Sequence, residues 1–117
     1  MSGKSATVLP LQNYRGRSQT LYFSRNELNQ LLGLYSRNVA RGVWRDYAID
    51  HRAGLAMFSV FRHTQEGAIY TIAKSTIGGT PQFTVLCGRQ RLNAAATLGE
   101  ALDYFRSNLM LVSSAKL

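Results

Sequence analysis

Acidic residues, cysteine and long apolar segments are all scarce in this chain of 117 residues. The single cysteine, Cys87, excludes an internal disulfide and any zinc site that needs several thiolates. No apolar run approaches the roughly 18 residues of a membrane-spanning helix, and no apolar segment follows Lys4 as it would in a secretory signal. We therefore expect neither a membrane span nor a secretory leader.

The shortage of acids leaves a net charge of +8, because 14 Lys and Arg oppose only six Asp and Glu. Most of these cations are arginine, whose planar guanidinium binds phosphate through two parallel hydrogen bonds. The excess favours an anionic partner such as nucleic acid, although a basic protein without such a partner can have the same composition. Apolar residues make up 45% of the chain, which is enough for the core of one globular domain.

Periodicity divides the chain into three parts. Residues 1–20 have no helical or strand period and carry basic residues but no acid, so we expect a flexible basic arm. Residues 21–112 contain all the periodic segments and are predicted to form a single α+β domain. Residues 113–117 are expected to fray.

A capping-box pair marks the start of the first predicted helix. Ser24 and Glu27 begin a helix over residues 25–41, and Gly42 ends it. The residues that fall on its predicted apolar face are Leu28, Leu31, Leu32, Tyr35 and Val39.

Four strand-like runs follow, at residues 44–50, 55–62, 68–74 and 82–87. Their aromatic and β-branched residues predict a four-stranded antiparallel meander, with a loop over the Gly-Gly segment between the last two runs. The second run is apolar on both faces. We therefore expect it to be central, with a helix layer on one face and the second helix, the arm or another copy of the chain on the other.

The segment after the last run is predicted to be a basic connector over residues 88–96. Thr97 and Glu100 repeat the capping-box pattern and begin a second helix, which is predicted to reach Leu111. The complete prediction is an α+β fold with an N-terminal helix, a four-stranded antiparallel meander and a C-terminal helix.

Two sequence segments, FSRNELNQLLGLYSRNVARGVWRDYAIDH and AMFSVFRHTQEGAIYTIAK, span most of the chain from Phe23 to Lys74. Over this part the chain resembles a short, mainly alphaproteobacterial family of uncharacterised proteins, classed as a domain of unknown function. The resemblance implies a cytoplasmic bacterial context. It implies no activity, so no catalytic or binding residue is transferred from the family.

Residues with catalytic or metal-binding chemistry are too far apart to form a site. Asp46 and Asp50 would lie about 13 Å apart along a strand, and His51 and His63 would lie about 30 Å apart at opposite ends of a hairpin. Cys87 has no nucleophile signature around it and is expected to be a small core thiol at a strand end. We therefore expect a protein that is not an enzyme and uses no cofactor and no metal.

Aromatic residues on successive strand-like runs allow two interpretations. Trp44, Phe61 and Tyr70 could form an exposed row on which single-stranded bases stack. The alternative is that these rings belong to the core or to a subunit interface, which is the more common role of aromatic residues on strands.

The leading functional hypothesis is a non-catalytic binding module that contacts RNA or DNA through arginine clusters. The predicted contacts are Arg15 and Arg17 in the arm, Arg37 and Arg41 on the first helix, and Arg89 and Arg91 in the connector. The alternative is a protein-interaction or homodimeric accessory subunit that uses an apolar sheet face. Arginines gathered on one face would favour the first hypothesis, and an exposed apolar patch would favour the second.

Overall fold

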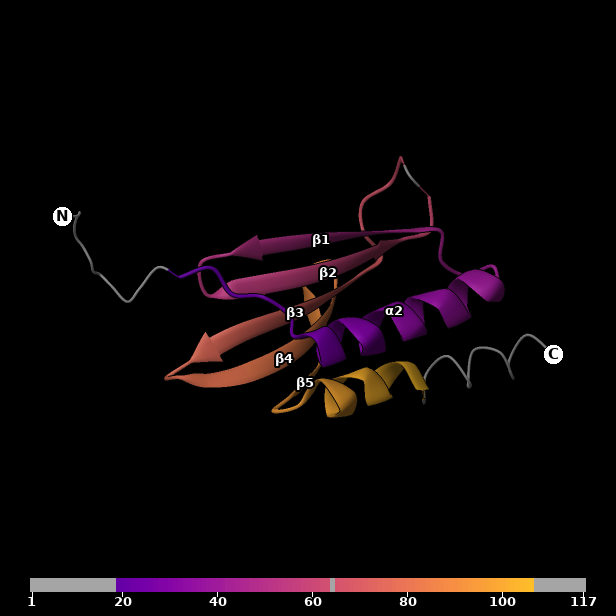
Figure 1. The fold of residues 1–117 in the computed structure, drawn as a ribbon. Helices are drawn as coiled ribbons and strands as arrows, with labels where there is room; N and C mark the ends of the chain where they lie inside the picture. Colours follow the sequence, from indigo (N-terminus) through magenta and orange to yellow (C-terminus); the bar gives the residue numbers. More distant parts are fainter. Residues whose placement is uncertain (1–18, 64, 107–117) are drawn as a thin grey trace.

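A computed structural model describes residues 19–63 and 65–106 of the chain. Its elements are α2 (Arg25–Ala40), β1 (Asp46–Arg52), β2 (Leu55–Phe61), β3 (Tyr70–Ile77), β4 (Thr80–Cys87), β5 (Gln90–Ala95) and a C-terminal helix over residues 98–106. The strands form one antiparallel sheet in the order β1-β2-β3-β4-β5 (Figure 1). The predicted α+β class is confirmed, but the meander has five strands instead of four.

The additional strand, β5, lies within the segment that was predicted to be a basic connector. It pairs with β4 along almost its whole length, and the register shifts at a bulge between Val85 and Leu86. Its sequence, QRLNAA, has little intrinsic preference for a strand, because Asn and Ala are depleted in sheets. Pairing with the regular strand β4 therefore outweighs a weak local signal.

The predicted loop between the third and fourth runs is also wrong. β3 and β4 continue to Ile77 and Thr80, so that only Gly78 and Gly79 connect them. Both glycines have positive φ, 60° and 84°, which is the conformation that a two-residue hairpin of the tightest type requires at both positions. The two glycines thus form a tight turn between long strands.

The start of α2 agrees with the prediction. The Glu27 N–H donates to Ser24 Oγ at 3.1 Å, and the Ser24 N–H donates to Glu27 Oε1 at 2.8 Å, which completes the capping box. Lys74 of β3 reaches the same place, where its Nζ donates to Glu27 Oε1 and to the Tyr22 carbonyl oxygen, both at 2.9 Å. The N-terminus of the helix is therefore bonded directly to the middle of the sheet.

Both helices pack on the same face of the sheet (Figure 1). The core under them contains alternate residues of the central strands, among which Phe58, Val60, Ile72 and Val85 are fully buried. Phe105 of the C-terminal helix is also buried and packs at its edge against Trp44 and Tyr70. Trp44 and Tyr70 therefore belong to the core or its margin and do not form an exposed row.

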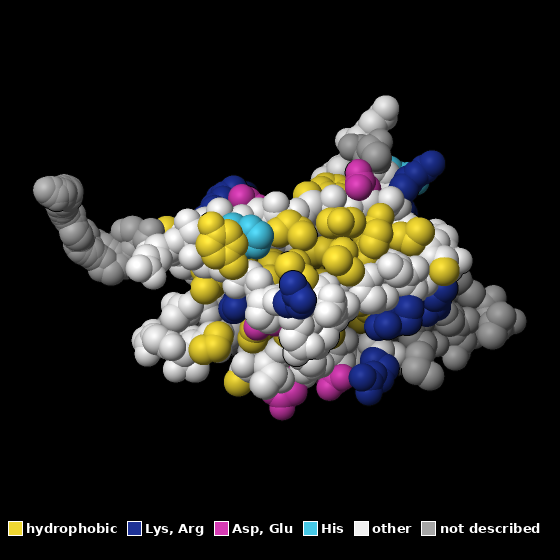
Figure 2. Space-filling model, viewed as in Figure 1, with side chains coloured by type: hydrophobic (Ala, Val, Ile, Leu, Met, Phe, Trp, Pro, Cys, Tyr) yellow, Lys and Arg dark blue, Asp and Glu magenta, His cyan; other side chains and the backbone are white. Residues whose placement is uncertain are grey.

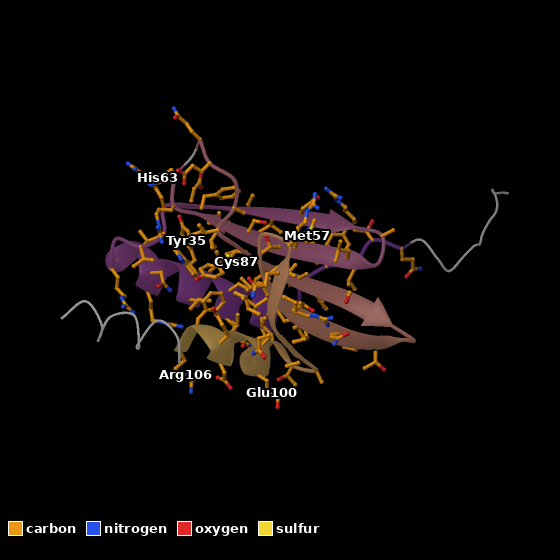
Figure 3. The ribbon with its side chains drawn as sticks, turned by 180° about the vertical axis from the view of Figure 1, so that it is seen from behind. Tyr35, Met57, His63, Cys87, Glu100 and Arg106 are labelled. Carbon is orange, nitrogen blue, oxygen red and sulfur yellow. The ribbon has the colours of Figure 1, made fainter. Side chains whose placement is uncertain are left out.

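The opposite face of the sheet has no helix over it in the described part of the chain, as the view from behind shows (Figure 3). In β2 this face carries Leu55, Met57, Ser59 and Phe61, all of them half-buried. The expectation that β2 is covered on both sides is thus not met within the described residues. The cause is that the second helix packs beside the first helix on the same face.

The buried face of α2 differs from the predicted one. Leu31, Leu34 and Asn38 are buried, whereas Val39, which was placed on the apolar face, is 40% exposed. Leu34 and Asn38 line the groove beside the C-terminal helix, whereas Val39 lies one turn after Tyr35, whose ring packs against Tyr47 of β1. A second helix on one side of α2 shifts the buried stripe toward that side.

The C-terminal helix begins at the predicted position. Glu100 donates its N–H to Thr97 Oγ1 at 3.3 Å, and Asn93 of β5 donates to the Ala101 carbonyl oxygen at 3.0 Å. The predicted end of this helix at residue 111 and the frayed tail lie outside the described residues. Most of the predicted arm does too, but Thr20 bridges Ala53 at the β1–β2 turn, so ordered structure begins before residue 21.

Candidate functional site

A groove of about 590 Å³ runs between α2 and the C-terminal helix on the outer side of the molecule. Three arginines line it, two from the C-terminal half of α2 and one from the other helix: Arg37, Arg41 and Arg106. Lys and Arg side chains gather on this part of the surface, near the ends of the two helices (Figure 2). The groove thus brings Arg106 close to Arg37 and Arg41, which precede it by 69 and 65 residues in the sequence.

Glycine keeps the groove open on both of its walls. Gly33 of α2 and Gly99 of the C-terminal helix both line it. A Cβ atom at Gly33 would lie 3.6 Å from Arg37 Nη1, so the Arg37 side chain folds back over the glycine. A Cβ atom at Gly99 would lie 3.8 Å from Gln30 Oε1 across the groove. Larger side chains at Gly33 and Gly99 would fill the space beside the Arg37 guanidinium and the Gln30 amide.

The described lining of the groove carries a net positive charge. Within the described residues Arg37 makes no ion pair, and the single acid in the lining is Asp103. Asp103 lies 3.6 Å from Arg106, but both side chains are more than half exposed. An exposed pair at this distance is weak, so Arg106 can exchange Asp103 for another anion at little cost.

The floor of the groove contains a buried polar group. Asn38 is 2% exposed and lines the groove, and its Nδ2 donates to the Leu34 carbonyl oxygen at 2.9 Å. Its Oδ1 is buried and has no hydrogen-bond partner among the described residues. A buried acceptor without a partner costs free energy, so this atom favours a ligand that brings a donor as well as an anion.

The other predicted contacts are not part of this groove. Arg89 lies in the exposed turn between β4 and β5, and Arg91 pairs with Leu86 on the sheet face that the described helices leave uncovered. Arg15 and Arg17 lie outside the described residues. The structure therefore brings together Arg37 and Arg41 but not the six predicted arginines as one cluster.

Sequence reasoning did not select Arg106 or Asn38. Arg106 follows the core residue Phe105 on the second helix, but nothing in the sequence indicates that this helix lies beside Arg37 and Arg41. Asn38 lies one turn beyond Leu34 on a face that becomes buried only because of the same packing. Both residues are brought to the groove by the packing of the two helices, which the local sequence around each of them does not indicate.

The residues considered for catalysis or metal binding remain separate. The Asp46 carboxylate accepts the Tyr47 N–H at 2.8 Å, and Asp50 pairs with Arg52 at 2.7 Å. His51 lies in β1 at the closed end of the first hairpin, and His63 follows the far end of β2. No group of three potential metal ligands occurs among the residues that the structure describes.

Cys87 ends β4, as predicted, but its side chain is exposed, so the expectation of a core thiol is wrong. Alternation places Cys87 on the same face as the buried residues Phe83 and Val85, but Cys87 is the last residue of β4 and the chain turns directly after it, so its side chain lies at the exposed end of the strand. Within the described part of the chain, no helix has the length and apolarity to cross a membrane.

Comparisons with known proteins give one match. No curated protein matches the chain, and no solved structure matches it. A family model matches residues 21–84, which include α2, the first three strands and the first half of β4. The matched region is more than half of the chain and contains the segments on which the sequence resemblance rests. The chain therefore belongs to the DUF2794 family of proteins of unknown function.

Proposed function

We propose that this protein is a non-catalytic module that binds nucleic acid through its phosphates, in the groove between α2 and the C-terminal helix. The observation that supports the proposal is the convergence of Arg37, Arg41 and Arg106 on one groove from two helices. Arginine holds a phosphate through two parallel hydrogen bonds, and several arginines in one groove can contact successive phosphates of a strand. Contacts of this kind position a strand without selecting its sequence.

The polar groups beside the arginines suit a nucleic acid better than a simple anion. Asn29 and Gln30 line the groove together with Asn38. These amides can donate to phosphate and sugar oxygens, and the Asn38 Oδ1 can accept from a sugar hydroxyl or a base amino group. The net charge of +8 would also attract any polyanion to the protein before specific contacts form.

A competing explanation is that the arginines only stabilise the helix ends. Arg37 lies in the last turn of α2, and cations at a helix C-terminus are stabilising by about 0.3–1 kcal/mol each. This explanation and the proposed binding role differ in what the removal of the arginines changes. In the first case stability falls, and in the second case binding falls.

The double substitution Arg37→Ala with Arg41→Ala tests the proposal. We expect it to weaken binding to mixed-sequence RNA or DNA, and to reduce the slope of log affinity against log salt by about 1.4–1.8, because two phosphate contacts are lost. We expect the melting temperature to change little. Fluorescence anisotropy at several salt concentrations measures binding, and a thermal scan measures stability.

The matched control is Arg89→Ala with Arg91→Ala, which removes the same charge from the β4–β5 hairpin. If both double variants lose affinity equally, the general charge of the protein and not the groove is responsible. If the wild-type protein binds neither polymer at low salt, the proposal is wrong. If the groove variant instead melts well below the wild type, the arginines have a structural role.

A further inference from the structure

The sheet face that carries no helix in the described part of the chain has apolar side chains on its central strands (Figure 3). The larger ones, all half-buried, are Leu55, Met57 and Phe61 of β2 and Leu86 of β4. Two hydroxyls lie among them, Ser59 Oγ and Thr71 Oγ1, and they hydrogen-bond to each other at 3.2 Å. Because these hydroxyls are already paired, an apolar partner can cover them without leaving them unsatisfied.

One row of paired residues crosses this open face from one edge of the sheet to the other. Residues paired in register on neighbouring strands lie on the same face and at the same level along the strands. From β1 to β5 the row is Ala48, Ser59, Thr71, Leu86 and Arg91. Arg91 at one edge of the open face is therefore level with Ala48 at the other edge.

The two ends of this row carry opposite charges. Side chains alternate along a strand, so Asp46 and Asp50 lie on the same face as Ala48, one on each side of it. Within the described residues Asp46 and Arg91 make no ion pair, and Asp50 pairs with Arg52 in an exposed contact. The open face thus has two acids beside the row at β1, a cation at β5 and apolar side chains between them.

A two-fold axis parallel to β3 makes this charge pattern complementary to itself. Rotation about such an axis, placed between two facing copies of the sheet, brings β5 of one copy over β1 of the other. Arg91 of each copy then lies opposite Ala48 of the other copy, between Asp46 and Asp50. Facing sheets pack about 10 Å apart, and an arginine and an aspartate side chain can span this gap together.

The other two-fold arrangement of facing sheets lacks this complementarity. An axis perpendicular to the strands, at the level of the row, places β1 over β1 and β5 over β5. Arg91 would then face Arg91 of the second copy, and Asp46 would face Asp50. Like charges that face each other are destabilising, so the charge pattern selects the axis parallel to β3.

We propose that two copies of the chain pack face to face through the open sheet face, with a two-fold axis parallel to β3. The apolar side chains of the two sheets then form the centre of a β-sandwich, and Arg91 meets the two acids at both of its edges. The groove lies beside the helices on the other face of each sheet, so each copy keeps its own groove. The dimer does not depend on the proposed nucleic-acid binding.

The chain before α2 leaves this face open where it is described. The Leu21 N–H donates to the Arg52 carbonyl oxygen at 2.9 Å, and Thr20 bridges Ala53. Backbone hydrogen bonds between strands lie in the plane of the sheet. Residues 19–21 therefore extend the sheet beside the end of β1 and do not cover the face that the second copy would contact.

Complementary charge reversal tests the arrangement by sedimentation equilibrium of the full chain. The wild type is expected to approach twice its 13.0 kDa mass as its concentration rises. Arg91→Asp, and separately Asp46→Arg with Asp50→Arg, place like charges opposite each other, so each variant should self-associate about tenfold more weakly or worse. An equimolar mixture of the two variants pairs opposite charges at both edges again, so the dimer mass should return.

A second pair of variants tests the apolar centre of the interface. Met57→Glu places a charge in the middle of the open face and is expected to keep the chain monomeric. The matched control is Ile49→Glu, which adds the same charge on the helix-bearing face of the sheet at a side chain that is 37% exposed, and which should dimerise like the wild type. Circular dichroism of every variant confirms that it is folded.

Three results would each overturn the proposal. One is a wild type that stays monomeric at its highest soluble concentration, as it would if a different partner covers this face. Another is equal dimerisation of Met57→Glu and Ile49→Glu, because the open face would then not be the interface. The third is a mixture of the two charge variants that dimerises no better than either alone, because the axis would then be wrong.

Discussion

Replacing Phe105 with alanine is expected to lower the free energy of unfolding by about 3–5 kcal/mol. The side chain is 1% exposed, and its ring lies 5.5 Å from that of Trp44 and 5.0 Å from that of Tyr70. Its removal takes away the apolar contact that attaches the C-terminal helix to the sheet and leaves a cavity between rings that cannot easily close around it. Urea unfolding measured by tryptophan fluorescence reports the loss directly, since Trp44 is the single tryptophan.

The control for this substitution is Asp103→Ala on the same helix. Its carboxylate is more than half exposed, and among residues 19–63 and 65–106 its one ion pair is the long contact with Arg106, so the change is expected to stay within about 0.5 kcal/mol. Equal effects of the two substitutions would mean that the C-terminal helix is not packed through Phe105. Because this helix forms one wall of the groove, Phe105→Ala should also reduce the proposed binding of nucleic acid.

Replacing Lys74 with methionine is expected to cost about 2–3 kcal/mol. The side chains of Lys74 and Glu27 are only 13% and 18% exposed, and Lys74 Nζ bonds both Glu27 Oε1 and the Tyr22 carbonyl oxygen. Methionine keeps the length of the side chain but removes the charge. It would leave the Glu27 carboxylate partly buried without a cation and the Tyr22 carbonyl without this donor.

A double-mutant cycle with Glu27→Gln separates the ion pair from the capping box. The two losses should be less than additive if Lys74 and Glu27 interact as the structure indicates. Arg52→Met provides the exposed comparison, because Arg52 and Asp50 are 65% and 47% exposed, and it should cost under about 1 kcal/mol. If Lys74→Met costs no more than this comparison, the ion pair does not join α2 to the sheet.

Elements specified by local chemistry were predictable from the sequence. The capping box at Ser24 and Glu27 marks the start of α2, because it depends on residues three positions apart. β2 was also predictable, because its apolar and aromatic residues favour a strand regardless of its neighbours in the sheet. β5 was missed because its residues do not favour a strand, and only the neighbouring β4 stabilises it there.

The groove was only partly predictable, because it results from the packing of two helices that are separated by the whole sheet in the sequence. Arg37 and Arg41 could be paired from their helical spacing. Arg106 and Asn38 could not be assigned to the same place without knowing that the C-terminal helix lies beside α2. The same packing explains why Val39 is exposed, although its spacing from Leu31 and Leu32 suggests an apolar face.

Amide chemical-shift mapping tests the central claim most directly. Isotope-labelled protein is titrated with a short mixed-sequence RNA, and the shift of each backbone amide is followed by two-dimensional nuclear magnetic resonance. The proposed binding mode predicts that the largest shifts occur together in Gly33 to Arg41 of α2 and in Gly99 to Arg106 of the C-terminal helix. Shifts confined to the β4–β5 hairpin, or no shifts at low salt, would contradict the assignment of the groove as the binding site.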